Sequence, residues 1–165
     1  MSAGILIKQV TIKPNLIKMA SEAAFAEGEK KAAVQFLTWC NAGSPSEPAT
    51  PPIRWGVLRG SSSVFVESEF LNDYPQKIKS GANETPDPLK SYTGKKGVIT
   101  IVYNLEYAFR MHEERGKTWE NLGFYSEQAM NATDKWLEKH LASDGKDLYA
   151  MIARVVSKIL SERVL

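Results

Sequence analysis

Cysteine and histidine, two residue types common in active sites, are scarce in this chain of 165 residues. It contains one cysteine, Cys40, and two histidines, His112 and His140. A single cysteine excludes an internal disulfide and fits folding in a reducing compartment. Because Cys40 has no histidine or aspartate near it in a known catalytic pattern, we expect it to be a small buried residue of the core.

Long apolar runs and an excess of one charge are also missing. No stretch approaches the roughly 18 consecutive apolar residues of a membrane-spanning helix, and residues 1–10 show no signal peptide. The 21 basic and 19 acidic residues leave a formal charge of +2, which is too balanced to indicate a nucleic-acid-binding protein. We therefore expect no membrane contact, and synthesis in a cytoplasm.

The composition that remains, 43% hydrophobic and 24% charged, is that of an ordinary globular domain. β-Branched residues in near-alternation predict strands over 5–12, 62–68 and 97–103. Apolar residues at three- and four-residue spacing predict helices over 16–42, 105–112 and 125–141, and a last one from 146. We expect one α+β domain, 1–165, in which a long N-terminal helix and C-terminal helices pack on a small, mainly antiparallel sheet.

Several local expectations follow from single residues. Gly28 is the weakest point of the first helix, and the 97–103 strand should be buried on one face. Asn104 should cap the short helix, whose apolar face would carry Leu105, Ala108, Phe109 and His112. The run Ser143–Asp144–Gly145 should separate the last two helices. Phe36 and Trp136 should be buried between the helices and the sheet.

The segment 72–96 is polar, is interrupted by proline and glycine, and has no sustained period. Long loops of this kind are commonly functional or disordered. We expect the strands that flank it to pair like a hairpin, with the loop as a long tip that is mobile in the isolated subunit and contacts a neighbouring one. The candidate contact residues are Lys77, Lys79, Lys90, Lys95 and Lys96. The alternative is a solvated surface loop.

No set of residues in the sequence forms a recognisable catalytic or cofactor site. In His112–Glu113–Glu114, successive helix positions point about 100° apart, so we expect these side chains not to converge on one metal ion. The zinc-protease pattern would need a second histidine where Gly116 stands. The glycines do not form a phosphate-binding loop, and Ser61–Ser63 lack the glycines of a nucleophile elbow. The sequence predicts no catalytic residue, no cofactor and no metal.

The order of the elements nevertheless resembles a known family. A long helix precedes a proline-rich loop, then a Gly-x-Leu-Arg-x-Ser element entering a strand, then a strand leading into Tyr-Ala-x-x-x-His-Glu. This resembles the neck proteins of long-tailed bacteriophages, which are called tail-completion, minor capsid or head–tail joining proteins. The matching residues are Gly56, Leu58, Arg59, Gly60, Ser61, Tyr107, Ala108, His112, Glu113, Gly123, Phe124 and Ala129. The chain departs from the family at Trp55, where threonine is common.

The resemblance implies a structural virion protein located at the head–tail junction. Such a subunit would form a homo-oligomeric ring of roughly six copies or a multiple of six. It would contact the neighbouring neck, connector and tail proteins, while double-stranded DNA passes through the lumen without specific binding. A nearly neutral charge agrees with a conduit that does not hold phosphates.

For the motif residues, the resemblance and elementary chemistry together suggest structural roles. Gly56 and Gly60 would permit a tight corner between the loop and the strand. Arg59 would bind free carbonyls or a carboxylate at that corner, with Glu113 as the suggested partner. Tyr107 and Ala108 would pack against the preceding strand.

Three other interpretations remain open. Within the phage neck, the chain could be a tail terminator or a head-closure ring protein. In a different class, it could be a non-viral protein-interaction module. An enzyme would require a pocket that holds His112 beside a carboxylate of raised pKa.

Overall fold

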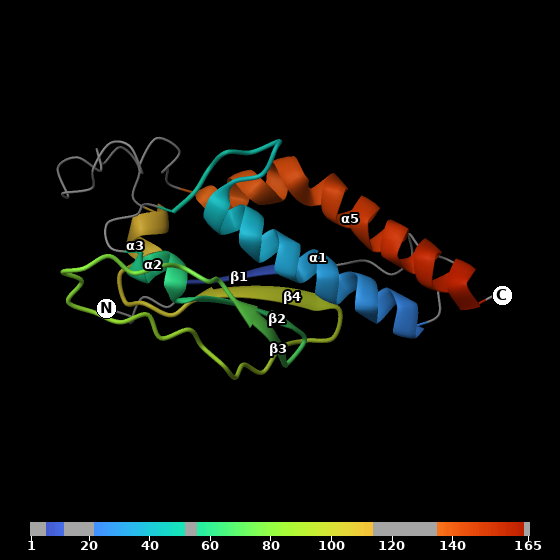
Figure 1. The fold of residues 1–165 in the computed structure, drawn as a ribbon, viewed down its shortest axis with the longest axis horizontal. Coiled ribbons are helices and arrows are strands. Elements are labelled where there is room, and N and C mark those ends of the chain that lie inside the picture. The colour runs from blue at the N-terminus through green and yellow to red at the C-terminus, as the bar shows by residue number, and fades with distance from the viewer. Residues whose placement is uncertain (1–5, 12–21, 52–55, 114–134, 164–165) are drawn as a thin grey trace.

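The computed structural model describes residues 6–11, 22–51, 56–113 and 135–163. Four antiparallel strands stand in the order β1–β4–β2–β3, and two long helices lie side by side across one face of this sheet (Figure 1). The strands are β1 (Leu6–Thr11), β2 (Ser62–Val66), β3 (Glu69–Asp73) and β4 (Val98–Tyr103), and the helices are α1 (Glu22–Ala42), α2 (Val57–Gly60), α3 (Ala108–Glu113) and α5 (Trp136–Arg163). The expected α+β architecture is confirmed.

β4 is the central strand that organises the sheet. It pairs on one side with β1, where Leu6 lies opposite Tyr103, and on the other with β2, where Val64 lies opposite Ile101. The predicted pairing of the strands around the long loop is therefore confirmed. β3 was not predicted, because Glu69–Asp73 is a largely polar segment. It forms as an edge strand on β2, with a register shift between Val64 and Phe65.

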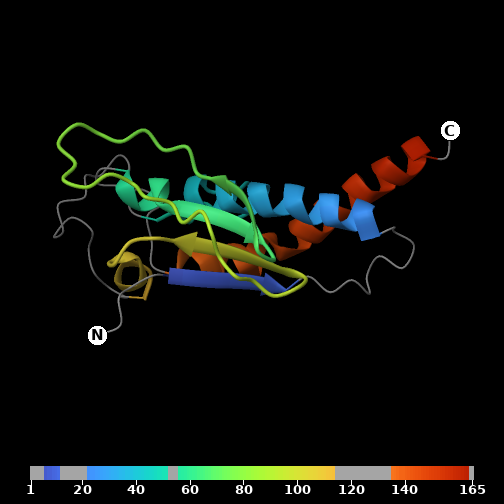
Figure 2. The same cartoon turned by 90° about the horizontal axis from the view of Figure 1, so that it is seen from below.

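The long loop is a crossover between parallel strands, and the expectation that it is the tip of a β2–β4 hairpin is wrong. β3 and β4 are both antiparallel to β2, so they run parallel to each other and the chain must travel back along the sheet between them. Residues 74–97 form this crossover on the face of the sheet that points away from the helices (Figure 2). The Tyr92 ring lies 5.7 Å from that of Phe65, and its hydroxyl accepts from Gln9 of β1 at 3.0 Å.

The loop explains why all six residues of β4 are buried. Side chains alternate between the two faces of the sheet along β4. Ile99 and Ile101 face the helices, whereas Thr100 and Val102 face the side that the loop covers. The expectation of a strand buried on one face is wrong, because that expectation assumed an uncovered second face. Phe65, which is fully buried on the loop side, packs edge-on against Phe70.

The main core lies between the sheet and the two long helices. Phe36 is 2% exposed and Trp136 is fully buried, as predicted. Cys40 is also fully buried, and burial and the nearby Asp144 charge raise the pKa of its thiol well above the ordinary value. A protonated, enclosed thiol fits the predicted role as a core residue.

α1 and α5 are in close contact at Gly28. A Cβ atom at this position would lie 3.1 Å from Ile152 Cγ2 and 3.2 Å from the Ile152 carbonyl oxygen. α1 therefore continues through Gly28 as one helix from Glu22 to Ala42, and the missing side chain permits the contact. The predicted first part of this helix, 16–21, lies outside the described residues.

The two helices predicted near the C-terminus are one helix, α5, in the structure. It begins at Trp136, after Lys135 with its positive φ of 52°, and it continues through Ser143–Asp144–Gly145 to Arg163. The predicted break at these residues is wrong, and the predicted helical segment 125–134 lies outside the described residues. Toward the core, Val156 is buried, whereas Val155 is only partly buried. In the part of the chain that the structure describes, none of the helices has the length and apolarity needed to cross a bilayer.

Candidate functional site

The predicted polar residues at the end of α3 meet the beginning of α5. His112 is fully buried, and its Nδ1 lies 2.8 Å from Glu113 Oε1 while its Nε2 lies 2.7 Å from Glu138 Oε2. Lys135 binds Glu113, and Lys8 of β1 binds Glu138. We call these five residues the His112 cluster.

The cluster overturns the expectation that His112 and Glu113 cannot converge. Adjacent helix positions do diverge at Cβ, but the longer glutamate side chain folds back to the imidazole. Glu138 then approaches from another helix. One nitrogen of His112 and one oxygen from each of Glu113 and Glu138 lie within 4.8 Å of one another, a set that can hold a metal ion.

Electrostatics favour an ion-pair network over metal binding. Burial raises the pKa of the Glu138 carboxyl, but the Lys8 hydrogen bond and the His112 charge outweigh it, so the net pKa is below the ordinary value. Each of the two carboxylates already has a lysine ammonium group as a partner. A metal ion would have to displace both lysines, and we therefore assign the cluster to joining β1, α3 and α5.

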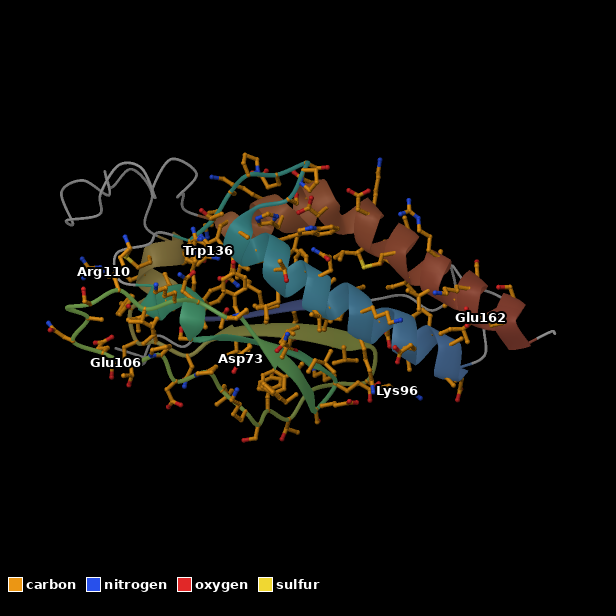
Figure 3. The ribbon with its side chains drawn as sticks, in the orientation of Figure 1. Asp73, Lys96, Glu106, Arg110, Trp136 and Glu162 are labelled. Carbon is orange, nitrogen blue, oxygen red and sulfur yellow. The ribbon has the colours of Figure 1, made fainter. Side chains whose placement is uncertain are left out.

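Aromatic packing fixes the histidine ring within this network. The His112 ring lies edge-on to Trp136, with centroids 4.7 Å apart, and the Tyr103 ring packs on Trp136 from 5.8 Å. Figure 3 shows Trp136 at the start of α5, close to α3. Because Lys135 N also donates to the His112 carbonyl at 2.8 Å, the two helix ends are joined by backbone as well as side chains.

The second histidine explains why α5 is continuous. His140 Nδ1 lies 2.5 Å from Asp144 Oδ2, one helical turn away, and its Nε2 lies 2.6 Å from the Ala49 carbonyl oxygen. Ser44 donates to Asp144 Oδ1 at 2.6 Å. Asp144 is therefore a buried, satisfied residue rather than a helix breaker.

The first motif segment, Gly56–Ser61, forms a buried corner at the start of β2. Gly56 has a φ of 89°, which confirms the expected tight turn. Arg59 is 8% exposed and donates from Nε and from Nη2 to the Pro51 carbonyl oxygen, at 3.3 and 3.1 Å. Burial lowers the pKa of its guanidinium to about 10. The expected carbonyl contact is confirmed, but its partner is Pro51, and the suggested pairing with Glu113 is wrong.

The remaining residues of this corner also have structural contacts. Ser61 Oγ donates to the Leu58 carbonyl at 2.7 Å, and Leu58 is 5% exposed in the main core. A Cβ atom on Gly60 would lie 3.0 Å from Pro86 Cβ, so the crossover loop packs directly on this glycine. The corner is consequently covered from the loop side.

The second motif segment follows β4 and begins α3. Ala108 is fully buried as expected, whereas Tyr107 is 36% exposed and Phe109 is 53% exposed, so placing Phe109 on the apolar face was wrong. Burial, with a smaller effect from the Glu84 charge, raises the pKa of Tyr107 to about 12. Asn104 precedes α3 by four residues, and its Nδ2 donates to the Asp87 carbonyl at 2.7 Å, so it does not cap this helix. The matching residues Gly123, Phe124 and Ala129 lie outside the described residues.

The five lysines of the crossover loop are the predicted contact residues. All are exposed, and Lys90 binds Asp73 within the same chain while its Nζ lies 4.4 Å from the Phe70 ring centroid. Their contact with a neighbouring subunit stays a prediction. Sequence reasoning missed Glu138, Lys135 and Lys8 of the His112 cluster, since nothing in their spacing indicated that they would meet.

Comparison of the chain with models of known protein families, with curated proteins and with solved structures finds no significant match.

Proposed function

We propose that the protein is a structural subunit of the neck of a tailed bacteriophage, which forms a ring that completes the tail or joins head to tail and lets DNA pass. The proposal rests on the resemblance of its motif segments to that family. One observation adds support: the two segments, Gly56–Ser61 and Tyr107–Glu113, stand at the same end of the sheet. The Asn104 N–H between them donates to the Ser61 carbonyl at 3.1 Å.

This proximity supports the proposal because two short motifs that matched by coincidence would not be expected to lie next to each other in the fold. β2 begins beside the end of β4, with Ser62 opposite Tyr103, so the two motifs are joined at a single corner. Arg59 of the first segment and Ala108 and His112 of the second are all buried. Motif residues with structural contacts support the proposal of a structural protein.

An exposed aromatic pair at this corner suits assembly. Tyr107 and Phe109 are the large apolar side chains that are exposed among the described residues. Aromatic residues are enriched at protein–protein interfaces, where they bury a large area at low cost in side-chain entropy. Glu106 and Arg110, their neighbours in the sequence, are also exposed and are labelled in Figure 3, as in an interface with a polar rim. The loop lysines are a second candidate contact with a neighbouring ring.

The proposal can be tested by disrupting the gene for this chain in the genome that encodes it. Disruption should yield heads and tails that do not join, and the wild-type chain supplied in trans should restore infectious particles. Phe109→Glu should fold, because its side chain is half exposed, but should restore few particles. Lys158→Glu, a charge reversal at an exposed site on α5, is the matched control and should restore them fully. Tailed, infectious particles from the disrupted gene would contradict the proposal.

A further inference from the structure

A pocket of about 380 Å³ opens at the end of the sheet opposite the motif corner. It lies between α1, the β2–β3 turn and the last residues of the crossover loop. Its charged and backbone walls are Glu29, Lys30, Glu67, Glu69, Gly94 and Lys96, and Lys96 marks its position in Figure 3. Its volume lies in the range of small-molecule sites.

Glu29 is the unusual residue of this pocket. It is 5% exposed, and among the residues that the structure describes no hydrogen-bond partner reaches its Oε1. A buried carboxylate oxygen without a donor is costly, and native proteins normally satisfy such a group. Burial, together with the Glu67 charge, raises the pKa of the Glu29 carboxyl above its ordinary value of 4.5. Among the described residues, the Glu29 Oε1 atom therefore lacks a hydrogen-bond donor.

The wall opposite Glu29 is held in a fixed, strained conformation. Glu67 has a φ of 56°, which is uncommon for a residue with a side chain, and its Oε1 accepts from the Gly97 N–H at 3.2 Å. Gly94 packs directly against the Glu67 backbone, because a Cβ atom added to Gly94 would lie 1.8 Å from the Glu67 carbonyl oxygen. Strain of this kind persists where the surroundings fix the backbone, and it is concentrated at functional sites.

The charges around the pocket favour a cation. Three glutamates and two lysines line it, which leaves one negative charge in excess when all are ionised. Lys30 is bound by both oxygens of Glu69, at 2.7 and 2.9 Å, and so does not neutralise Glu29. Among the described residues, a set of three histidine, cysteine or acidic side chains close enough to hold one metal ion is found at the His112 cluster and not here, which favours an organic cation over a metal ion.

We propose that this pocket binds a primary alkylammonium group, which donates hydrogen bonds to Glu29 and lies between the Glu29 and Glu67 carboxylates. The group belongs either to a free alkylamine or to the lysine side chain of a partner, and the two share one chemistry. An ammonium donor supplies the bond that Glu29 Oε1 lacks and lowers the repulsion between the two carboxylates. The proposal does not depend on the phage-neck function.

The test is a titration of the full-length, ¹⁵N-labelled chain with n-butylammonium chloride, followed by NMR. The amides of Glu67, Gly94 and Gly97 should shift and saturate, with a dissociation constant on the order of 1 mM. Tetramethylammonium has the same charge but no N–H donor, and it should bind roughly tenfold more weakly if a charge-assisted hydrogen bond is involved. Equal binding of both cations, or no shift at these amides, would overturn the proposal.

Variants localise the effect. Glu29→Gln should weaken n-butylammonium binding roughly tenfold, whereas Glu27→Gln, at an exposed position on the same helix, should leave it unchanged. Glu67→Gln provides a second variant if Glu29→Gln alters the fold. Unchanged binding in both pocket variants would refute the site. Magnesium chloride that saturates the same amides more tightly would refute the ammonium assignment.

A final arm separates the two sources of the ammonium group. Nα-acetyl-lysine methylamide that binds at least as well as n-butylammonium would identify the site as a receptor for a partner's lysine. Weaker binding of this compound, with n-butylammonium still saturating, would identify a site for a free amine. Either result supports the alkylammonium chemistry.

Discussion

Replacing Gly28 by alanine should destabilise the protein, although alanine is the better helix former. Alanine in a helix interior is favoured over glycine by about 1 kcal/mol. The new Cβ atom, however, would lie 3.1 Å from Ile152 Cγ2, 3.2 Å from Ile152 O and 3.3 Å from Ile152 Cα. Two of these three atoms belong to the backbone of α5 and move only if the helix moves.

The magnitude follows from the balance of these two effects. Overpacking a tight contact costs typically about 1–3 kcal/mol, and the gain in helix propensity offsets about 1 kcal/mol of it. The expected net loss is therefore about 1 kcal/mol. Gly145 is the matched control, because it also lies inside a long helix but a Cβ atom there would meet nothing within 4 Å. Gly145→Ala should stabilise the protein by up to about 1 kcal/mol.

Urea unfolding monitored by far-UV circular dichroism measures both changes. The two transition midpoints should move in opposite directions with an unchanged slope m, and the melting temperatures should differ from wild type by about 2–4 °C in opposite senses. If both alanine variants were stabilised to a similar extent, α1 and α5 would not approach as described, and the reasoning would be refuted.

Three further predictions concern burial and charge. Ile152→Asp should lose several kcal/mol, about 3–5, because it places an unpaired charge in the core; a folded variant of near-normal stability in urea would contradict this. Glu138 has a lowered pKa in the folded state, so its contribution to stability is present above the unfolded pKa and is lost as pH falls through the folded one. Glu138→Gln should accordingly flatten the acid side of the pH–stability curve, and an unaltered curve would count against the His112 cluster. Glu29 has a raised pKa in the folded state, so its effect on stability has the opposite sign: the free energy of unfolding falls as pH rises from the unfolded-state pKa to the folded-state pKa. Glu29→Gln should remove this fall and stabilise the ligand-free protein at neutral pH by about 1 kcal/mol. A Glu29→Gln variant that is less stable than wild type at neutral pH would refute this prediction.

The sequence allowed three of the strands, α1 and the helical character of most of α5 to be predicted, because these depend on local periodicity, but it did not predict that α5 is one continuous helix. Val98–Tyr103 is β-branched and apolar throughout, which few structures other than a buried strand accommodate. Glu69–Asp73 could not be predicted, since its pairing with β2 supplies the stability that its own residues lack. Its presence also changes the direction of the long loop, so the burial of Phe65 beneath Tyr92 could not be predicted either.

The side-chain contacts of the His112 cluster, Asp144 and Glu29 could not be predicted, because they depend on side-chain conformations and on residues distant in the sequence. His112 and Glu113 were recognised as a polar pair, but whether they meet depends on rotamers and on Glu138, which arrives from another helix. Asp144 was assigned to a helix break from its intrinsic propensity, and the structure overrides this through His140 and Ser44. Glu29 gave no signal at all, because a glutamate on a helix rich in lysine and glutamate is ordinarily solvated.

Imaging of purified particles tests the proposed function most directly. Particles from the genome that encodes this chain should be purified, checked for the chain by mass spectrometry and reconstructed at the head–tail junction by electron cryomicroscopy. The account predicts a closed ring at the junction whose subunit density fits the four-stranded sheet with α1 and α5 on one face. It also predicts that Tyr107 and Phe109 lie in a contact with a neighbouring chain. Particles that lack the chain, or a neck built without this fold, would contradict the account.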